Sequence, residues 1–267
     1  MTTVAAENVY TAADHLAAIW ATLPATLRPT SAGPEVLALG GRSTDWPQRL
    51  TAAAEGGARG VVVLDPAPVA GTAVRELAVS VSIPVVIQTS WSTNPAVALF
   101  RERWTEELSR ATTIRVLSQY DRQRPIESAL LDQLALVRAA VGPVSGVSFA
   151  RFDEHSHVVV AESAGRLVHL HGVRTSVGAG RARLSALGAD REHWLELPPS
   201  GTATPAQVAE ANPGGIHILP AVHEDGARTT WRTVHDLLTG KQTGDELTSL
   251  ADDLDQLSAA VTLSRRR

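Results

Sequence analysis

The first half of the chain alternates fully apolar segments with helical ones, and this alternation limits the possible folds most. "PEVLALGG", "GVVVLDP" and "IPVVIQTS" are apolar along their length, which is typical of strands buried on both faces. Helices are predicted between and after them, with Asp45 and Asn94 as N-cap residues of two of these helices. The series ends with the strand "TTIRVLSQ". Strands separated by single helices, without hairpin signals, predict right-handed crossovers and a parallel sheet.

After Tyr120 the pattern changes. A long helix, "IESALLDQLALVRAAVG", is followed by four segments that alternate apolar and polar residues, with "SAG" as a hairpin turn between two of them. The segment "PPSGTATPAQVAEANPGG" is predicted to be a loop around one short helical stretch, and two helices close the chain. We therefore predict an α/β plus α+β protein. Residues 1–120 would form a partial Rossmann-like domain with a parallel sheet, and residues 121–267 an α+β domain with an open, mostly antiparallel sheet.

Composition excludes several classes of protein. Hydrophobic residues make up 44% of the chain and charged residues 19%, so a sizeable core is expected. The net charge of −4, without a basic face, argues against nucleic-acid binding. Cysteine is absent, which excludes disulfides and thiolate metal sites. With no signal peptide and no apolar run of membrane-spanning length, we expect a soluble, cytoplasmic protein.

The order of these segments resembles that of the Gfo/Idh/MocA family, named after glucose–fructose oxidoreductase and inositol dehydrogenase. "VYTAADHLAAIW" is similar to the family segment in which a short strand leads into a helix. "GGARGVVVLDP" is similar to the step that carries Glu-Lys-Pro, and "ESALLDQLALVRAAVG" to the helix that carries an Asp and a His. The resemblance covers nearly the whole chain. It implies a Rossmann domain followed by an α+β domain, and NAD(P)-dependent oxidoreductase activity.

The chain departs from the family at the cofactor site. A strand followed by G-x-G-x-x-G normally holds the dinucleotide pyrophosphate, and this sequence has no such motif. The first matching segment corresponds to a point about two strands into the family fold. We therefore predict a truncated family member without cofactor-binding residues or a bound cofactor.

The residues that match the family's catalytic positions are also altered. Asp65, in Leu64-Asp65-Pro66, takes the place of a lysine that positions substrate and nicotinamide. Asp132 matches an Asp that contacts substrate, and Leu136 falls where the family has its proton-exchanging His. Leucine cannot accept a proton, so this acid–base step would be lost. No catalytic residue is assigned. A remnant ligand cleft is predicted instead, consisting of Asp65, Pro66, Trp91 and Asp132.

Two functional hypotheses follow. The first is a pseudoenzyme that has lost NAD(P) binding and hydride transfer and acts as a small-ligand-binding, assembly or regulatory protein, with a full-length relative as one possible partner. The alternative is an oxidoreductase for a sugar- or cyclitol-like substrate, in which another chain completes the site for NAD or NADP. A metal held by Asp65 and Asp132 is a weaker third reading, since two carboxylates facing one cleft would repel unless a cation intervened.

Four histidines flank the predicted hairpin turn: His155, His157, His169 and His171. A three-residue turn would set His157 opposite His171 on the open face, with Val158, Val160, Val168 and Leu170 on the other face, toward the helices. Polar residues of an exposed or dimer-contact face are the simplest interpretation. A zinc site and a pH-sensitive interface are the alternatives.

The resemblance also suggests a mode of association. Helices would cover only one face of the second sheet, and in the family the open face commonly packs against a second subunit. Because exposed apolar patches usually mark interfaces, we predict a homodimer formed through this sheet.

Overall fold

The structure is a computed structural model of the whole chain, and it describes residues 2–7, 13–23, 27–30, 33–177, 180–240 and 246–264. It divides into two compact units. The first consists of Met1–Thr89 and Gly226–Leu254, and the second of Ser90–Asp225 and Asp255–Arg267. This division differs from the predicted boundary near residue 120, because the second unit begins at Ser90 and the chain returns to the first unit at Gly226. None of the described helices is long and apolar enough to cross a membrane.

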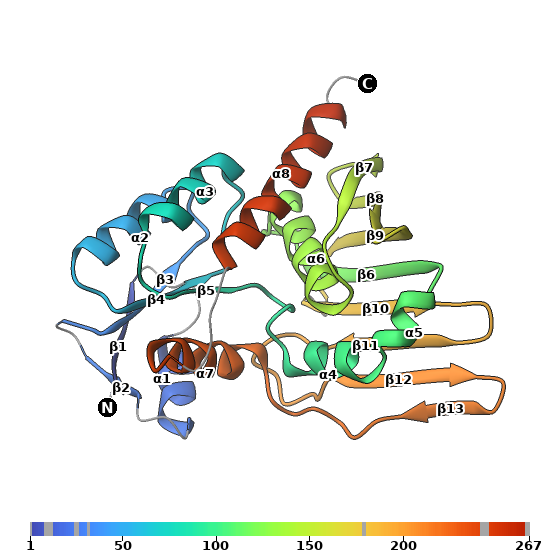
Figure 1. Cartoon of the computed structure of the whole chain (residues 1–267), viewed down its shortest axis with the longest axis horizontal. Coiled ribbons are helices and arrows are strands. Elements are labelled where there is room, and N and C mark those ends of the chain that lie inside the picture. Colours follow the sequence, from blue (N-terminus) through green and yellow to red (C-terminus); the bar gives the residue numbers. More distant parts are fainter. Residues whose placement is uncertain are drawn as a thin grey trace. The chain divides into compact units, whose positions relative to one another are not determined.

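The first unit is a parallel five-stranded sheet in the order β2-β1-β3-β4-β5, as predicted for an α/β unit (Figure 1). Its strands are β1 (Thr2–Glu7), β2 (Leu27–Pro29), β3 (Val36–Gly40), β4 (Gly60–Leu64) and β5 (Val85–Gln88). Its helices are α1 (Ala13–Thr22), α2 (Trp46–Glu55), α3 (Gly71–Ser80) and α7 (Gly226–Leu238).

The first strand was not expected from the sequence. β1 occupies Thr2–Glu7 and pairs with both β2 and β3, so two strands precede the segment "PEVLALGG". The predicted strand at residues 9–10 lies outside the described residues, whereas the predicted helix after it is α1. The alternation of strand and helix therefore begins at the start of the chain.

α1 and α7 pack on one face of this sheet, and a core cluster joins them to the strands. The cluster includes Trp20 of α1 and Trp231 of α7, whose rings meet edge to face at 5.1 Å. Trp231 is fully buried. Gly60 faces Val234 of α7, where an added Cβ would come within 3.3 Å of a methyl group. This close packing is why α7 belongs to the first unit.

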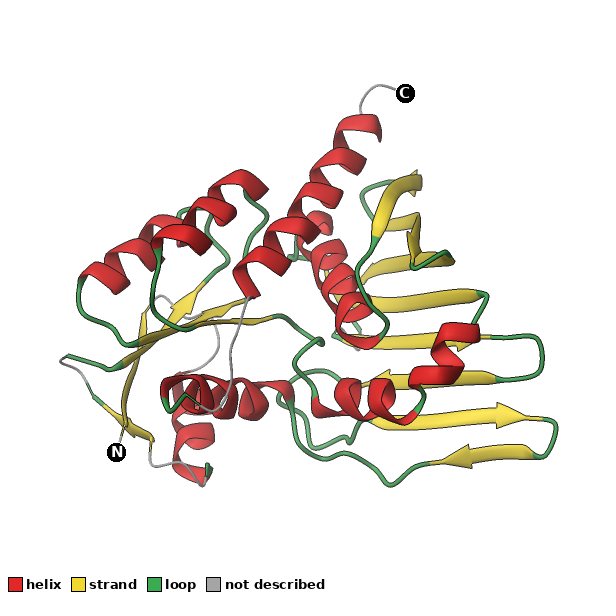
Figure 2. Ribbon diagram, viewed as in Figure 1, coloured by secondary structure: helices red, strands yellow, loops and turns green. Residues whose placement is uncertain are grey.

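The second unit is an eight-stranded sheet in the order β13-β12-β11-β10-β6-β9-β8-β7 (Figures 1 and 2). Its strands are β6 (Thr113–Asp121), β7 (Ser145–Phe152), β8 (Ser156–Ser163), β9 (Arg166–Thr175), β10 (Arg181–Leu187), β11 (Glu192–Leu197), β12 (Gln207–Asn212) and β13 (Gly215–Ile218). Only β6 and β9 pair in parallel, so the prediction of a mostly antiparallel sheet is confirmed.

Two sequence predictions for this unit are wrong. "TTIRVLSQ" forms β6 inside the second sheet and does not continue the parallel series of the first. Its exposure alternates along the strand, with Ile114, Val116 and Tyr120 buried, as expected for a sheet with one open face. The predicted loop with a short helix is instead the hairpin β12–β13, in which Asn212 pairs with Gly215 across the turn.

The helices of the second unit lie on one face of its sheet (Figure 2). They are α4 (Pro95–Arg103), α5 (Thr105–Arg110) and α6 (Ile126–Ala140). The predicted single helix after Asn94 breaks at Trp104, which separates α4 from α5. α8 (Glu246–Ser264) contributes to both units, with the division at Leu254. The opposite sheet face carries no helix in the described part of this unit.

Candidate functional site

Asp65 ends β4 in a strained backbone conformation. Its φ of 51° lies in the left-handed region, which non-glycine residues rarely adopt. The backbone N–H of Asp65 donates to the carbonyl of Gln88 at 2.8 Å, and Pro66 follows it, buried. The side chain of Asp65 accepts a hydrogen bond from Nη2 of Arg42 at 2.9 Å. The carboxylate of Asp65 is therefore held by a neighbouring guanidinium.

The loop after β3 is fixed against the Asp65 segment by backbone contacts. Gly41 donates to the carbonyl of Leu64 and accepts from Ala67, both at 2.7 Å. A Cβ at Gly41 would lie 2.8 Å from the carbonyl oxygen of Leu64 and from Cα of Pro66. Only glycine allows two chain segments to approach this closely. The glycines that end β3 therefore serve contact with the protein's own backbone.

Asp132 belongs to the second unit, so the structure does not bring it together with Asp65 in one compact unit. It lies on α6 with 2% of its surface exposed, and its Oδ2 is 2.6 Å from Nη2 of Arg124. Its Oδ1 is 3.4 Å from the backbone nitrogen of Ser90. A buried carboxylate with these partners contributes to the structure of this unit.

Leu136 and Trp91 are both core residues. Leu136 lies one turn after Asp132 on α6 and is fully buried. Trp91 is 2% exposed, and its indole N–H donates to the carbonyl of Gly180 at 2.9 Å. Trp104 is likewise buried and packs on His193, with ring centroids 4.7 Å apart. Trp91, which the sequence suggested for the ligand cleft, is therefore packed inside the second unit, as is Trp104.

The turn between β8 and β9 has two residues, and this changes the predicted register. Ser163 pairs with Arg166, while Ala164 and Gly165 form the turn with φ of 49° and 76°. Positive φ at both positions matches a type I′ hairpin turn. His157 consequently pairs with Gly172, one residue from the predicted partner His171. A shift of one residue moves a side chain to the other sheet face.

The four histidines therefore do not form a cluster on one face of the sheet. His157 is fully buried on the helix-covered face, and His169 and His171 lie on the open face with Val158 and Val160. His155 precedes β8 and is exposed, with Nε2 3.1 Å from Glu154. The prediction of one histidine cluster is wrong. Among the residues that the structure describes, no group of three or more His, Asp or Glu could hold a metal ion.

His157 instead belongs to a buried polar network. Its Nε2 is 2.8 Å from Oε1 of Gln133 on α6, and its Nδ1 is 3.4 Å from the hydroxyl of Tyr120. Nε2 of Gln133 donates to Oγ of Ser118 at 2.7 Å and to the carbonyl of His171 at 3.0 Å. Burial lowers the pKa of His157 to about 4 and raises that of Tyr120 to about 12. Both groups are therefore neutral at physiological pH.

Gly172 makes room for the ring of His157. A Cβ at Gly172 would lie 2.2 Å from Cε1 and 2.6 Å from Nε2 of His157, a distance at which atoms overlap. Sequence reasoning missed this network, and it also missed the arginines Arg42 and Arg124 that pair with Asp65 and Asp132. Both arginines come within five residues after the end of a predicted strand, which is the only signal that could have indicated them.

Comparison with known proteins identifies solved structures of the same fold. The chain is similar to a proposed NADPH-dependent oxidoreductase from Desulfitobacterium hafniense, with a TM-score of 0.82 and 13% identity over 100% of this chain and 96% of that one. It is also similar to a proposed myo-inositol dehydrogenase from Sinorhizobium meliloti, with a TM-score of 0.70 and 11% identity over 100% and 98% of the two chains. A third similar structure is UDP-N-acetylglucosamine 3-dehydrogenase GnnA from Acidithiobacillus ferrooxidans, with a TM-score of 0.72 and 10% identity over 97% and 95%. No family model matches the chain, and no curated protein matches it.

These alignments correct the predicted truncation. The chain covers 95–98% of the three structures, and β1 and β2 are both present before the segment "PEVLALGG". The prediction that the first two strands of the fold are missing is therefore wrong.

Proposed function

We propose that this chain, which has the two-domain fold of the Gfo/Idh/MocA oxidoreductases, does not transfer hydride and acts as a binding protein. The proposal rests on the two residues of this chain that match the family's catalytic lysine and histidine. In the sequence resemblance Asp65 matches the lysine position, and it forms an ion pair with Arg42; Leu136 matches the histidine position, and it is fully buried. Leucine cannot exchange a proton with an alcohol or ketone, and an aspartate paired with Arg42 does not provide the positive charge of a lysine.

No lysine lies close to Asp65 in the sequence to take over the role of the family's catalytic lysine. Lys241 is the only lysine of the chain, and it lies 176 positions after Asp65, outside the described residues. Arg42 is the cation next to Asp65, but an arginine stays protonated at all physiological pH values and cannot act as a general acid or base. Arg42 and Leu136 therefore supply neither a general acid nor a general base, and Arg42 suits the binding of polar groups.

The residues at the expected cofactor position do not fit a dinucleotide. The connection from β1 to α1, residues 8–12, contains no glycine. A pyrophosphate needs backbone amides that it can approach closely at the head of the first helix. The glycine pair that ends β3 does not replace them, since the space beside Gly41 is filled by Leu64 and Pro66. No step through a nicotinamide is therefore derived.

The proposal predicts no response to nicotinamide cofactors. We expect that NAD, NADH, NADP and NADPH leave the melting temperature unchanged, because the pyrophosphate has no cradle. A ligand at 100 times its Kd would stabilise the folded protein by about 2.7 kcal/mol, which a thermal shift assay detects readily. An oxidoreductase of this fold that carries G-x-G-x-x-G serves as the positive control. A saturable shift with either cofactor pair would refute the proposal.

The second candidate is an NAD(P)-dependent oxidoreductase for a sugar- or cyclitol-like substrate, with its cofactor site completed by a partner chain. It is favoured by the similar structures, which are described as dehydrogenases and an NADPH-dependent oxidoreductase. The same titration decides between the two when it is repeated with an equimolar full-length relative from the same genome. NADPH oxidation above that of the relative alone would favour this candidate.

We further propose a homodimer through the open face of the eight-stranded sheet. Leu117, Leu167 and Val173 are 40–41% exposed on this face, so an apolar surface is left uncovered. Light scattering after gel filtration at micromolar concentration should give twice the chain mass of 28.2 kDa. Leu167→Arg should reduce the measured mass to that of a monomer, whereas the control Val79→Arg, on the exposed surface of α3, should not. A monomeric wild-type protein would contradict the proposal.

A further inference from the structure

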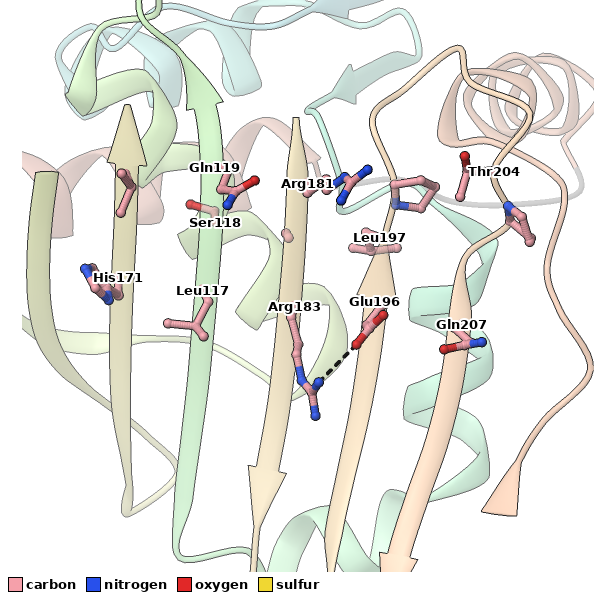
Figure 3. A pocket seen from close by; sticks show the side chains of 14 residues that line it. Leu117, Ser118, Gln119, His171, Arg181, Arg183, Glu196, Leu197, Thr204 and Gln207 are labelled. Carbon is pink, nitrogen blue, oxygen red and sulfur yellow. Dashed lines mark hydrogen bonds and ion pairs between the residues drawn. The ribbon is translucent and has the colours of Figure 1, made fainter. Parts of the chain in front are cut away.

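A pocket of about 650 Å³ lies on the open face of the second sheet. Its floor crosses five neighbouring strands, β9, β6, β10, β11 and β12, and the loop from Pro198 to Pro205 forms one wall (Figure 3). The side chains of neighbouring residues on β6 identify this face. Ser118 is buried on the side of α6, whereas Leu117 points to the opposite, open face and is 40% exposed. A volume of this size is typical of sites for small organic molecules.

The strand register arranges the pocket side chains in two rows. In the first row, each residue is the pairing partner of the next: His171, Leu117, Arg183, Glu196 and Gln207. In the second row, Val173 pairs with Gln119 and Gln119 with Arg181. Paired residues on one face have Cβ atoms about 5 Å apart, so each row is a continuous line of side chains. Figure 3 displays both rows on the same surface.

The two arginines of the pocket differ in whether a carboxylate compensates their charge. Arg183 is neutralised by Glu196, with Nη1 3.0 Å from Oε1, and it also contacts Glu192 at 3.4 Å. Arg181 is exposed at the end of β10, and among the described residues no carboxylate pairs with it. One uncompensated guanidinium therefore faces the pocket beside the amide of Gln119. A guanidinium in this situation binds carboxylate or phosphate groups by paired hydrogen bonds.

The remaining pocket residues suit a hydroxylated ligand body. Glu196 offers an acceptor, and Gln119, Gln207 and His171 offer both donors and acceptors at spacings set by the strands. Leu117 and Val173 provide apolar surface between them for the C–H groups of a ring or chain. Polar groups in a few positions on an apolar floor fix the orientation of a small ligand.

We propose that this pocket binds a small polyhydroxylated anion, a sugar acid or a sugar phosphate, with its anionic group on Arg181 and its hydroxyl groups on Gln119, Glu196 and Gln207. The pocket is lined by residues of one chain, on the sheet face opposite to α6 and Asp132. The proposal does not depend on the loss of hydride transfer, whereas Leu117 and Val173 also belong to the surface proposed for the dimer.

The test is calorimetric titration of the full-length protein with gluconate, glucose 6-phosphate, glucose and sodium sulfate. We expect binding of gluconate or glucose 6-phosphate at least tenfold tighter than binding of sulfate or glucose, because only the first two present both an anion and hydroxyl groups. Whichever of the two binds more tightly identifies the anionic group as carboxylate or phosphate. Equal binding of sulfate would mean an adventitious ion only and would overturn the proposal, as would no binding of either sugar anion at 10 mM.

Two variants distinguish binding in this pocket from a non-specific attraction of anions to the positively charged side chains of the surface. Arg181→Gln should weaken the sugar anion about 10- to 100-fold, the effect of losing a charge-assisted hydrogen-bond pair, and should leave glucose unaffected. Arg115→Gln is the matched control, because Arg115 lies on the open face of the same strand as Leu117, has the same charge and does not line the pocket. An equal loss in both variants would overturn the proposal, and so would an unchanged affinity in Arg181→Gln. Unaltered melting curves establish that both variants are folded.

Discussion

Replacing Asp132 by alanine is expected to lower the free energy of unfolding by about 3–5 kcal/mol. The carboxylate is 2% exposed and lies 2.6 Å from the guanidinium of Arg124, whose side chain is 17% exposed. Removing one member of a buried ion pair leaves the other charge without compensation in a poorly solvated position, which gives destabilisation of this size. Urea denaturation followed by circular dichroism measures the change.

A double-mutant cycle separates the ion pair from the loss of side-chain volume. The variant Arg124→Leu, alone and combined with Asp132→Ala, completes the cycle, and we expect the double variant to be more stable than the sum of the single effects predicts. Asp65→Ala is the matched control, because Asp65 also pairs with an arginine but its side chain is 23% exposed and Arg42 is 53% exposed. Its ion pair should contribute under 1 kcal/mol. If Asp132→Ala cost as little as Asp65→Ala, Asp132 would be free for ligand binding and its structural assignment would be wrong.

The protein is also expected to lose stability as the pH falls from about 6.5 to 4, because of His157. Burial lowers the pKa of His157 in the folded protein to about 4, whereas in the unfolded chain it stays near 6.5. Between these values the unfolded chain binds more protons than the folded one, so acid favours unfolding. The contribution is fully present above pH 6.5 and falls by roughly 3 kcal/mol by pH 4. Urea midpoints measured across this range report it.

His157→Gln should reduce the slope of stability against pH, because unfolding of this variant takes up as much as one proton less. Glutamine does not titrate, and it keeps a polar group near Gln133. His155→Gln is the control: His155 is exposed, with 68% of its side chain accessible, and its loss should leave the slope unchanged. The readout is the slope of stability against pH, so a lower overall stability of His157→Gln does not obscure the result. A wild-type slope retained in His157→Gln would show that His157 is not the responsible group.

The sequence predicted where the residues of the candidate site lie in strands and helices, but it did not predict which residues they pair with. The order of apolar and glycine-containing segments located Asp65 at the end of a strand and Asp132 on a helix, and both are found there. Their arginine partners could not be predicted, because Arg42 is 23 positions away from Asp65 along the chain and contact across that separation depends on how strands pair. The pocket was missed for the same reason, since its rows consist of residues from five strands.

The sequence by itself determined most of the strands and helices between β3 and β11, that the first sheet is parallel, and that the second alternates between a covered and an open face. These properties follow from local periodicity, which a single segment carries without its neighbours. Tertiary structure alone decided which sheet β6 joins and which face each alternating residue occupies. A period of two defines two sets of side chains but does not say which set is inside. The two-residue turn at Ala164 and Gly165 made that choice for β8 and β9, and it buried His157 against Gly172 while leaving His171 on the open face.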